Sequence, residues 1–208
     1  MSENDSNPGD LHLETGYLCL DFANTAEWHA SEQPTESLQR YTDLVAWAQK
    51  MGVSSAASAE QLSRAAAQQP NEAAAVWSRA IQLRETIYRL FSATAAGRSP
   101  DAADIALLNR ALPEALSRLR LARTEAGFML QWVETERELD QMLWPIIRSA
   151  AELLTSEEVE RVKECEDDRG CGYLFFDTSR NRSRRWCTMR GCGNRAKVKR
   201  YRQRHEET

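Results

Sequence analysis

The stretch CEDDRGCGYLFFDTSRNRSRRWCTMRGC, residues 165–192, holds four of the five cysteines of the chain. They form two close pairs with the spacing C-x5-C-x15-C-x4-C. Two such pairs allow two tight turns to place four thiolates tetrahedrally around a zinc ion. A segment of about 45 residues buries too little apolar surface to fold alone, so a metal would supply the missing stability. The pattern predicts one structural Zn²⁺ with the ligands Cys165, Cys171, Cys187 and Cys192.

Two other interpretations of this cysteine cluster are disulfide pairing and four unrelated buried thiols. Disulfides need an oxidising compartment, and the polar, acidic start MSENDSNPGD does not resemble a secretory signal. We therefore expect a cytoplasmic protein with reduced cysteines. A catalytic zinc is disfavoured because four thiolates leave no open coordination position for water. Cys19 lies in an apolar segment and is expected to be a core residue.

The segment between the two cysteine pairs predicts a β-hairpin with arms at 173–176 and 184–187. A helix is expected to begin at the last ligand, Cys192. Zinc knuckle, hairpin and helix together make a treble-clef-like zinc module. On helical geometry one face of this helix should pack on the hairpin. That face consists of Asn194, Val198, Tyr201 and His205.

The charges of the chain are unevenly distributed. Residues 178–205 contain eleven Lys and Arg and no acid, whereas residues 1–177 contain 29 acidic and 16 basic residues. This split indicates an acidic body and a basic segment suited to a polyanion. Cations on both flanks of a helix suit phosphate contacts in a nucleic-acid groove. The candidate contacts are Arg182, Arg184, Arg195, Lys197, Lys199, Arg200, Arg202 and Arg204.

Several alternatives exist for these basic residues. An acidic protein partner or a merely solvated charge run would also explain the helix, and RNA would serve as well as DNA. Asp177 and Asn181 are expected to be buried or turn-forming groups. The carboxylate of Asp177 suits a neighbouring guanidinium, and Arg180 suits this ion pair as well as a phosphate. Trp186 is expected to pack the small core rather than stack on a base. The arginines near Asp177 are Arg180, Arg184 and Arg185.

The whole chain predicts a mainly α (α+β) fold. Residues 1–10 are expected to be a disordered tail, 11–157 a helical domain with a small β-hairpin, and 158–208 the zinc finger with its basic terminal helix. The periodicity of 71–96 gives an apolar face broad enough for the centre of a bundle. Alternation around Gly127 predicts the hairpin at 118–133. Further helices are expected near 18–26, over 35–51, from Ser58, from Pro100 to Pro113, from Thr135 with a kink at Pro145, and from Thr155.

The stretch CGYLFFDTSRNRSRRWCTMRGCGNRAKVKRYRQR resembles the CGNR zinc-finger family, named for the tetrapeptide here at residues 192–195. The resemblance covers about residues 160–205 and rests on F-x-D-x-S-R-N, R-R-W-C and C-G-N-R-x-K. LCLDFANT, residues 18–25, and the helical body resemble the ABATE domain that commonly precedes this finger. Proteins of this architecture are described as candidate stress-induced transcription regulators. The resemblance therefore implies DNA binding and the same four zinc ligands.

Catalysis is disfavoured by the residue pattern. The histidines His12, His29 and His205 have neither a metal spacing nor a nucleophile partner, and no glycine-rich phosphate loop or nucleophile elbow is present. The helical body has three open roles: pairing two copies into a homodimer, folding back to mask the finger, or sensing a small molecule. A sensor would line its pocket with tryptophans that otherwise belong to the core. These are Trp28, Trp47, Trp77, Trp132 and Trp144.

No run of about 18 apolar residues is present, so no membrane span is expected. The sequence favours a DNA-binding transcription regulator, not an enzyme, that uses a structural four-cysteine zinc finger and a basic C-terminal helix. Stress or a ligand is the signal that its N-terminal domain would sense. The alternatives are a zinc-stabilised adaptor for protein interactions and an RNA-binding protein.

Overall fold

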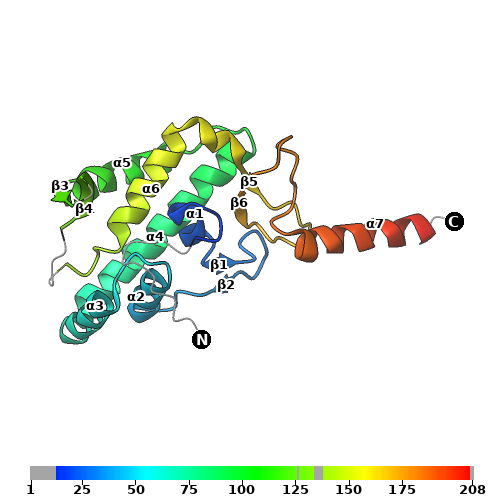
Figure 1. Cartoon of the computed structure of the whole chain (residues 1–208). Helices are drawn as coiled ribbons and strands as arrows, with labels where there is room; N and C mark the ends of the chain where they lie inside the picture. The colour runs from blue at the N-terminus through cyan, green and yellow to red at the C-terminus, as the bar shows by residue number, and fades with distance from the viewer. Residues whose placement is uncertain (1–12, 126, 134–137, 207–208) are drawn as a thin grey trace, which may run out of the picture.

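The computed structural model describes residues 13–125, 127–133 and 138–206 and shows a mainly helical chain with three small antiparallel strand pairs (Figure 1). This confirms the predicted fold class. The α-helices are α1 (Leu18–Ala23), α2 (Tyr41–Lys50), α3 (Ala56–Gln68), α4 (Pro70–Ala95), α5 (Ala102–Leu116), α6 (Leu143–Thr155) and α7 (Asn194–Glu206). A 3₁₀-helix, η1 (Glu157–Arg161), and a π-helical turn, η2 (Met189–Gly193), complete the helical elements. The strand pairs are β1 (Ala26–Glu27) with β2 (Thr35–Glu36), β3 (Leu119–Thr124) with β4 (Gly127–Trp132), and β5 (Val162–Glu164) with β6 (Leu174–Phe176).

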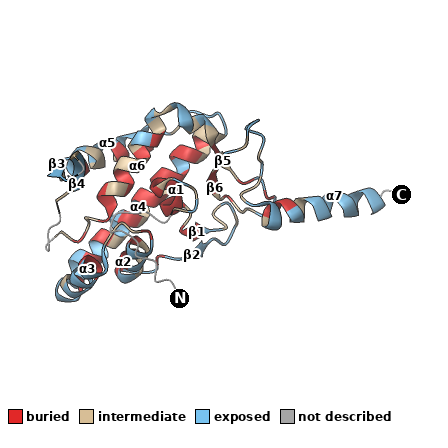
Figure 2. Ribbon diagram, in the orientation of Figure 1, coloured by how far each residue is buried: buried red, intermediate tan, exposed pale blue. Residues whose placement is uncertain are grey.

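The 26-residue helix α4 is the centre of the hydrophobic core. Its apolar stripe, including Val76, Ala80 and Ile87, is buried against the helices around it (Figure 2). Helix α6 adds Ile146 and Ala150 to the same core. The long helix predicted from the periodicity at 71–96 is confirmed. Its apolar face is so broad that other elements have to cover it on several sides, which places α4 at the centre.

The core continues into the C-terminal segment. Val162 of β5 and Leu174 of β6 belong to the same apolar cluster as α4 and α6. Asn24, just after α1, holds β6 through both side-chain atoms: Nδ2 donates to the carbonyl of Leu174 at 2.8 Å, and Oδ1 accepts from its N–H at 2.9 Å. The predicted boundary near residue 158 is therefore crossed by a shared core, and the β5–β6 pair rests directly on the helical body.

Two predicted helices have different bounds in the structure. The helix expected from Thr35 begins at Tyr41, because Thr35 and Glu36 pair with β1 instead. The helix expected from Pro100 to Pro113 is capped by Asp101, whose side chain accepts from the N–H of Ala103, and it ends at Leu116. It passes through Pro113, and Ala115 in the last turn is fully buried.

Other helix ends also differ from the prediction. The cap of α3 is Ser55, which accepts from the N–H of Ser58, so Ser58 is not the cap. Pro145 is the third residue of α6 and lies in its first turn, where its missing N–H costs no helical hydrogen bond, so it does not kink the helix. The short helix expected from Thr155 is η1. The tail at 1–10 and the predicted start at Thr135 lie outside the described residues.

The hairpin predicted at 118–133 is confirmed as β3–β4, with Leu119 opposite Trp132 and Thr124 opposite Gly127. It lies at the end of the molecule opposite α7 (Figure 1). Among the described residues, no helix is long and apolar enough to span a bilayer.

Candidate metal centre and basic helix

The four sulfur atoms predicted as zinc ligands come together in the structure. The Sγ atoms of Cys165, Cys171, Cys187 and Cys192 all lie within 4.8 Å of one another. Cys187 Sγ lies 3.8 Å from Cys171 Sγ and 3.6 Å from Cys192 Sγ. A tetrahedron with Zn–S bonds of about 2.3 Å has edges of about 3.8 Å, so the cluster has the size that zinc needs. All five cysteines are free thiols, which leaves these four available as ligands.

The first cysteine pair sits at the turn of the β5–β6 strand pair. Cys165 follows β5, and its N–H donates to the carbonyl of Tyr173 at 2.9 Å. The predicted pairing of 173–176 with 184–187 is wrong, because β6 pairs with β5. Burial of Val162 and Leu174 on the helical body fixes that choice of partner. The 184–187 segment approaches the first knuckle instead: the N–H of Glu166 donates to the backbone carbonyl of Arg185 at 3.0 Å.

Gly170 and Gly172 allow the knuckle to rest on the body. Both have positive φ angles, +84° and +62°. A Cβ on Gly172 would lie 2.7 Å from the backbone nitrogen of Ala30 and from the hydroxyl of Tyr88. Side chains at these two positions would therefore both strain the backbone and push the knuckle off the body.

The charges of the cluster also fit a cation. Hydrogen bonds with Cys171 and Cys187 lower the pKa of Cys165. Hydrogen bonds with Cys165 and Cys171 raise the pKa of Cys187 above its ordinary range. Four thiols this close cannot all ionise by themselves, whereas a bound metal ion deprotonates its thiol ligands. The four-cysteine donor set is consistent with one zinc site.

Arg195 joins the metal centre to the start of α7. Its Nη2 lies 2.8 Å from Cys192 Sγ and 2.8 Å from the carboxylate of Asp167. Burial alone would raise the pKa of Asp167, but hydrogen bonds with Arg169 and Arg195 lower it. The guanidinium therefore has a structural role at the ligand, in addition to its place among the predicted nucleic-acid contacts.

Trp28 is a part of this centre that sequence reasoning did not find. Its ring lies under two guanidinium groups, 4.9 Å from Cζ of Arg169 and 5.4 Å from Cζ of Arg195. The next residue, His29, donates its N–H to the carbonyl of Cys171 at 3.1 Å. The loop after α1 thus holds both the first knuckle and the first turn of α7. The one hint in the sequence is a tryptophan followed by a polar segment.

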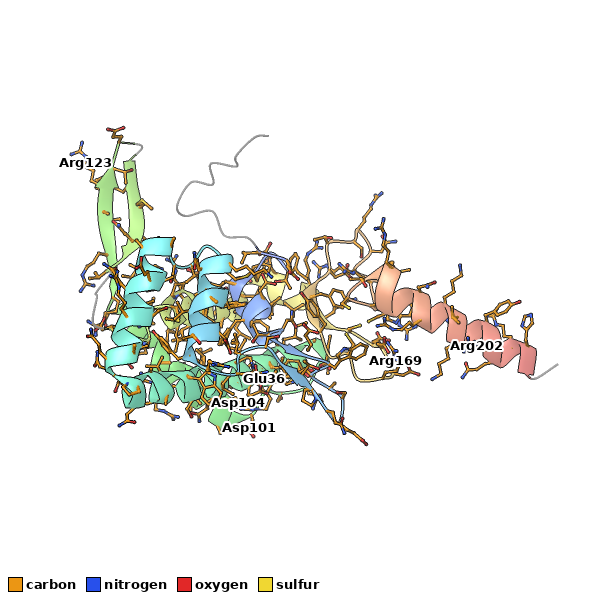
Figure 3. All side chains as sticks on the ribbon, turned by 90° about the horizontal axis from the view of Figure 1, so that it is seen from below. Glu36, Asp101, Asp104, Arg123, Arg169 and Arg202 are labelled. Carbon is orange, nitrogen blue, oxygen red and sulfur yellow. The ribbon has the colours of Figure 1, made fainter. Side chains whose placement is uncertain are left out.

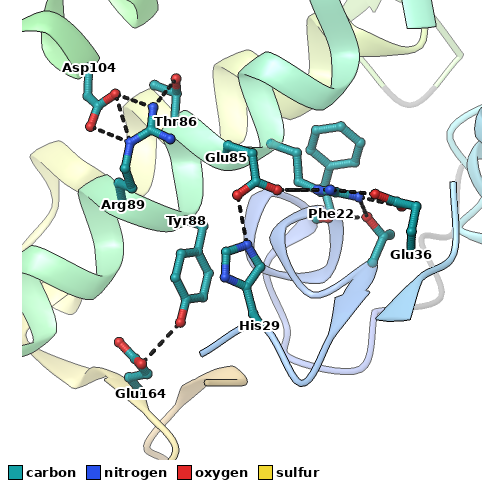
Figure 4. Close-up of polar contacts among 11 residues, drawn as sticks. Phe22, His29, Glu36, Glu85, Thr86, Tyr88, Arg89, Asp104 and Glu164 are labelled. Atoms are coloured by element: carbon teal, nitrogen blue, oxygen red, sulfur yellow. Dashed lines mark hydrogen bonds and ion pairs between the residues drawn. The ribbon is translucent and has the colours of Figure 1, made fainter. Parts of the chain in front are cut away.

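A polar cluster ties α4 to this loop and to β5 (Figure 4). His29 Nε2 lies 2.9 Å from Glu85, and the His29 ring stacks on Tyr88 at 3.4 Å. The Tyr88 hydroxyl donates to Glu164 of β5 at 3.0 Å, and Ser92 donates to the same carboxylate at 2.5 Å. Burial alone would raise the pKa of Glu85, but hydrogen bonds from His29 and Arg84 lower it to about 2.

Helix α7 extends away from the body and is exposed beyond its first turn (Figures 1 and 2). The prediction that one face packs on a hairpin is wrong: Val198 is 42% exposed and Tyr201 62%. The first turn is held instead by Arg195, and the stretch that precedes it is η2. The helix points outward from the body (Figure 1), and masking of the finger by the body, one of the three roles considered, stays a prediction.

The predicted nucleic-acid contacts fall into two groups. On α7, Lys197, Lys199, Arg200, Arg202 and Arg204 are exposed; Lys199 pairs with Asp168, and Arg200 lies over the ring of Trp186 at 5.7 Å. In the loop before the second knuckle, Arg182 pairs with Glu160 at 2.8 Å. Arg184 donates to the carbonyls of Trp186 and Cys187 and lies 4.6 Å from the ring of Phe175, so it braces the second knuckle.

Asp177 is fully buried, as expected, but its partners differ from the prediction. Its carboxylate accepts from the N–H groups of Ser179 at 2.9 Å and Arg184 at 3.0 Å and lies 3.3 Å from Lys163 Nζ. Burial alone would raise its pKa, and these contacts lower it to about 2. Asp177 therefore orders the loop through backbone groups and one ammonium group, not through a guanidinium. Trp186 packs in the small cluster of the cysteines, as expected.

The tryptophans considered for a sensor divide between core and cavity. Trp144 is buried, and Trp77 packs on the core and donates Nε1–H to the carbonyl of Leu38 at 2.8 Å. Trp28 and Trp47 line a cavity of about 410 Å³ beside Cys171. The effector stays a prediction.

Comparison with known proteins gives two matches to family models. The model ABATE, described as "Putative stress-induced transcription regulator", matches residues 16–157, more than half of the chain. The model CGNR zinc finger matches residues 161–205. Both resemblances seen in the sequence are thus confirmed, and neither description names an enzyme. No curated protein matches the chain.

Proposed function

The chain belongs to the ABATE family and carries a CGNR zinc finger. From this premise we propose that it is a DNA-binding transcription regulator and that helix α7 is the element that contacts DNA. It acts in the cytoplasm without enzymatic activity. One structural zinc ion, held by the four-cysteine cluster, keeps the start of α7 in place. The N-terminal domain is the part that would receive a stress signal or a ligand.

The observation that supports this proposal is that α7 projects outward from the four-cysteine cluster. A helix without an apolar face gains nothing by packing on the body, so its direction is set by its first turn and its exposed cations stay open to a partner outside the chain. Its exposed residues include Lys197, Lys199, Arg200 and Arg202, and none of the described side chains beyond its first turn is acidic. A solvated helix normally mixes both signs, whereas a helix that contacts phosphates needs one.

The residues of this chain have distinct tasks in the proposed complex. The zinc ion would supply rigidity only, since four thiolates fill its coordination sphere. Arg195 and Asp167 fix the first turn of α7 on the cluster, and Trp28 supports Arg195 from the body. The outer cations of α7 then meet phosphates with little further ordering, so less entropy is lost on binding.

The test is binding to duplex DNA over a range of salt concentrations. We expect the wild-type protein to show a salt slope equivalent to roughly 5–8 phosphate contacts. The variant Lys197→Glu/Arg202→Glu should weaken binding at least about tenfold and reduce the slope by about two or more. These two positions are chosen because neither has an ion-pair partner among the described residues, so the zinc module should stay intact.

A matched control removes the same charge from the helical body. Arg64→Glu/Arg110→Glu changes two exposed arginines on α3 and α5, far from α7 along the chain. It should leave affinity and salt slope close to those of the wild type. Equal losses in both double variants would mean that net charge, and not α7, drives binding, and the proposal would fail.

Two other functions are outcomes of the same titration. Tighter binding to RNA than to duplex DNA at every salt concentration would indicate an RNA-binding protein, since α7 offers cations to either polymer. Absence of binding to both polymers, with zinc bound, would favour a zinc-stabilised adaptor for an acidic protein.

A further inference from the structure

One side of helix α7 faces the first knuckle and is occupied by contacts with it. Ala196 on this side is half-buried and lines a hollow with Trp186. Lys199 pairs with Asp168, and Arg200 lies over the ring of Trp186. Because these contacts engage both cations and Asp168 repels phosphate, this side holds the helix on the knuckle and is not the side that meets DNA.

The other side of α7 carries an uncharged strip that is open to solvent. With 3.6 residues per turn, four positions fall within about 60° of one another on the helix. They are Asn194, Val198, Tyr201 and His205, which we call the open strip. Val198 is 42% exposed and Tyr201 62%, and Asn194 and His205 are exposed as well. The strip is therefore accessible along the whole described length of the helix.

Cations border the open strip on both edges. By the same helical geometry Lys197 lies about 40° from Tyr201 on one edge, and Arg202 lies about 40° from Val198 on the other. Arg169 of the knuckle lines a hollow beside the strip together with Arg202 (Figure 3). The acidic residue of that hollow is Asp168, which pairs with Lys199. An uncharged strip between two rows of cations fits the major groove, where base edges form the floor and phosphates form both walls.

We propose that the open strip contacts base edges in the major groove of duplex DNA and determines which sequence the protein prefers. This inference rests on the proposed function and adds sequence preference to it. The cations at the edges contact phosphates, which position the helix, and the strip contacts the bases, which differ between sequences. Duplex RNA does not fit the strip, because its major groove is too deep and narrow for side chains to reach the bases.

The side chains of the open strip set the expected sequence. The Asn194 amide can bond both N7 and N6 of adenine, and the methyl groups of Val198 suit the methyl group of thymine. From residue 194 to residue 201 a helix rises about 10 Å, which matches about three base pairs at roughly 3.4 Å each. We therefore expect a preferred core of about three base pairs that contains adenine and thymine.

The experiment selects binding sites from a pool of random duplex DNA with the zinc-loaded protein, and then measures affinity for the enriched sequence. The wild type should enrich a core of about three base pairs, the length that the strip spans. Asn194→Ala should lose at least about fivefold of the preference for adenine at one position, with the salt slope unchanged.

The matched control is Gln203→Ala, which removes an exposed amide on the opposite side of the same helix. It should enrich the same core as the wild type with the same preference at each position. Circular dichroism and zinc content check that both variants are folded.

A second test probes Val198 through a single methyl group of the DNA. Deoxyuridine in place of thymine removes only that methyl group. At one position of the enriched core this replacement should weaken binding of the wild type about threefold, the value of about one buried methyl group. In Val198→Ala the same replacement should have little effect, because the side chain that contacts the methyl group has been shortened.

The outcomes separate this inference from the function on which it rests. Absence of binding to duplex DNA at every salt concentration removes both. Binding without an enriched core, or an enriched core that Asn194→Ala leaves unchanged, overturns the inference alone, and so does equal loss of preference in Gln203→Ala. Equal affinity of the wild type for thymine and deoxyuridine at every position of the core contradicts the contact of Val198.

Discussion

Trp28 supports the start of α7 through single-residue contacts. Its ring lies below the guanidinium groups of Arg169 and Arg195, and Arg195 in turn contacts Cys192 Sγ and Asp167. Each such cation–π contact contributes about 0.5–2 kcal/mol. The helical domain therefore contacts the first turn of α7, the proposed DNA-binding helix, through the side chain of Trp28.

We expect Trp28→Ala to lower DNA affinity by about 3–10-fold while zinc stays bound, because the first turn of α7 loses its support. Affinity by fluorescence anisotropy and zinc by metal analysis are the measurements. Trp28→Phe keeps a ring under both arginines and should recover most of the loss. Unchanged affinity in Trp28→Ala would show that the body does not position α7.

Glu85 gives a prediction for pH. Its folded pKa of about 2 lies below its ordinary value of 4.5, so its contribution to stability is present above pH 4.5 and is lost as the pH falls toward 2. Glu85→Gln should destabilise the protein by about 1–3 kcal/mol at pH 7. The difference from wild type should shrink between pH 4.5 and 2.

Urea unfolding at several pH values measures this difference, and loss of zinc in acid affects both proteins alike. The control is Glu60→Gln, since Glu60 is exposed on α3 and, within the described ranges, its ion pair is with the exposed Arg64, at 3.7 Å. That variant should differ from wild type by less than about 0.5 kcal/mol at every pH. A Glu85 difference that stays constant through the acid window contradicts the role of its carboxylate.

Among the secondary-structure elements, the β5–β6 pair links the metal centre to the body. Val162 and Leu174 are buried in the main core, whereas Cys165 and Cys171 close the turn between the two strands. The two halves of the zinc module therefore differ in what holds them. The strands rest on apolar contacts with α4, whereas the second knuckle and α7 are joined to the rest through the four-cysteine cluster and the contacts of Arg184 and Arg195.

For the whole molecule, this difference predicts a partial response to metal removal. We expect a chelator to expose the four ligand cysteines to alkylation within minutes while Cys19 stays unreactive. Cys19 is fully buried in the core, and its burial raises the pKa of its thiol to about 12, so little thiolate exists near pH 8.

Mass spectrometry after alkylation counts the modified cysteines. Without chelator we expect slow modification, with chelator four labels, and with chelator and urea five. Far-ultraviolet circular dichroism should show that most of the helix content survives chelation, since the core of α4 and α6 contains no ligand. Rapid labelling of Cys19 on chelation alone would mean that zinc holds the entire fold.

Some elements of the fold and of the site could be predicted from the sequence, and others could not. Helix α4, the β3–β4 hairpin and the four clustered cysteines follow from periodicity, alternation and spacing, which are local properties of a few neighbouring residues. The helix starts at Tyr41 and Ala102 were not predictable. Thr35 and Glu36 pair with β1 and do not start a helix, and Asp101 caps the helix that was predicted from Pro100. Local preference separates each of these outcomes only slightly from the predicted one.

By itself the sequence determined the mainly helical class, the cysteine cluster and the basic C-terminal segment, because composition and spacing are fixed once the chain is written. Only the tertiary structure decided that β6 pairs with β5, that Trp28 supports Arg195 and that α7 stands away from the body. The first two features join residues far apart in the chain. Burial of Val162 and Leu174 in the core around α4 selects the partner of β6, and that burial exists only once the whole chain has packed. The direction of α7 follows from the contacts of Arg195 with Trp28, Asp167 and Cys192, which form only when both ends of the chain meet.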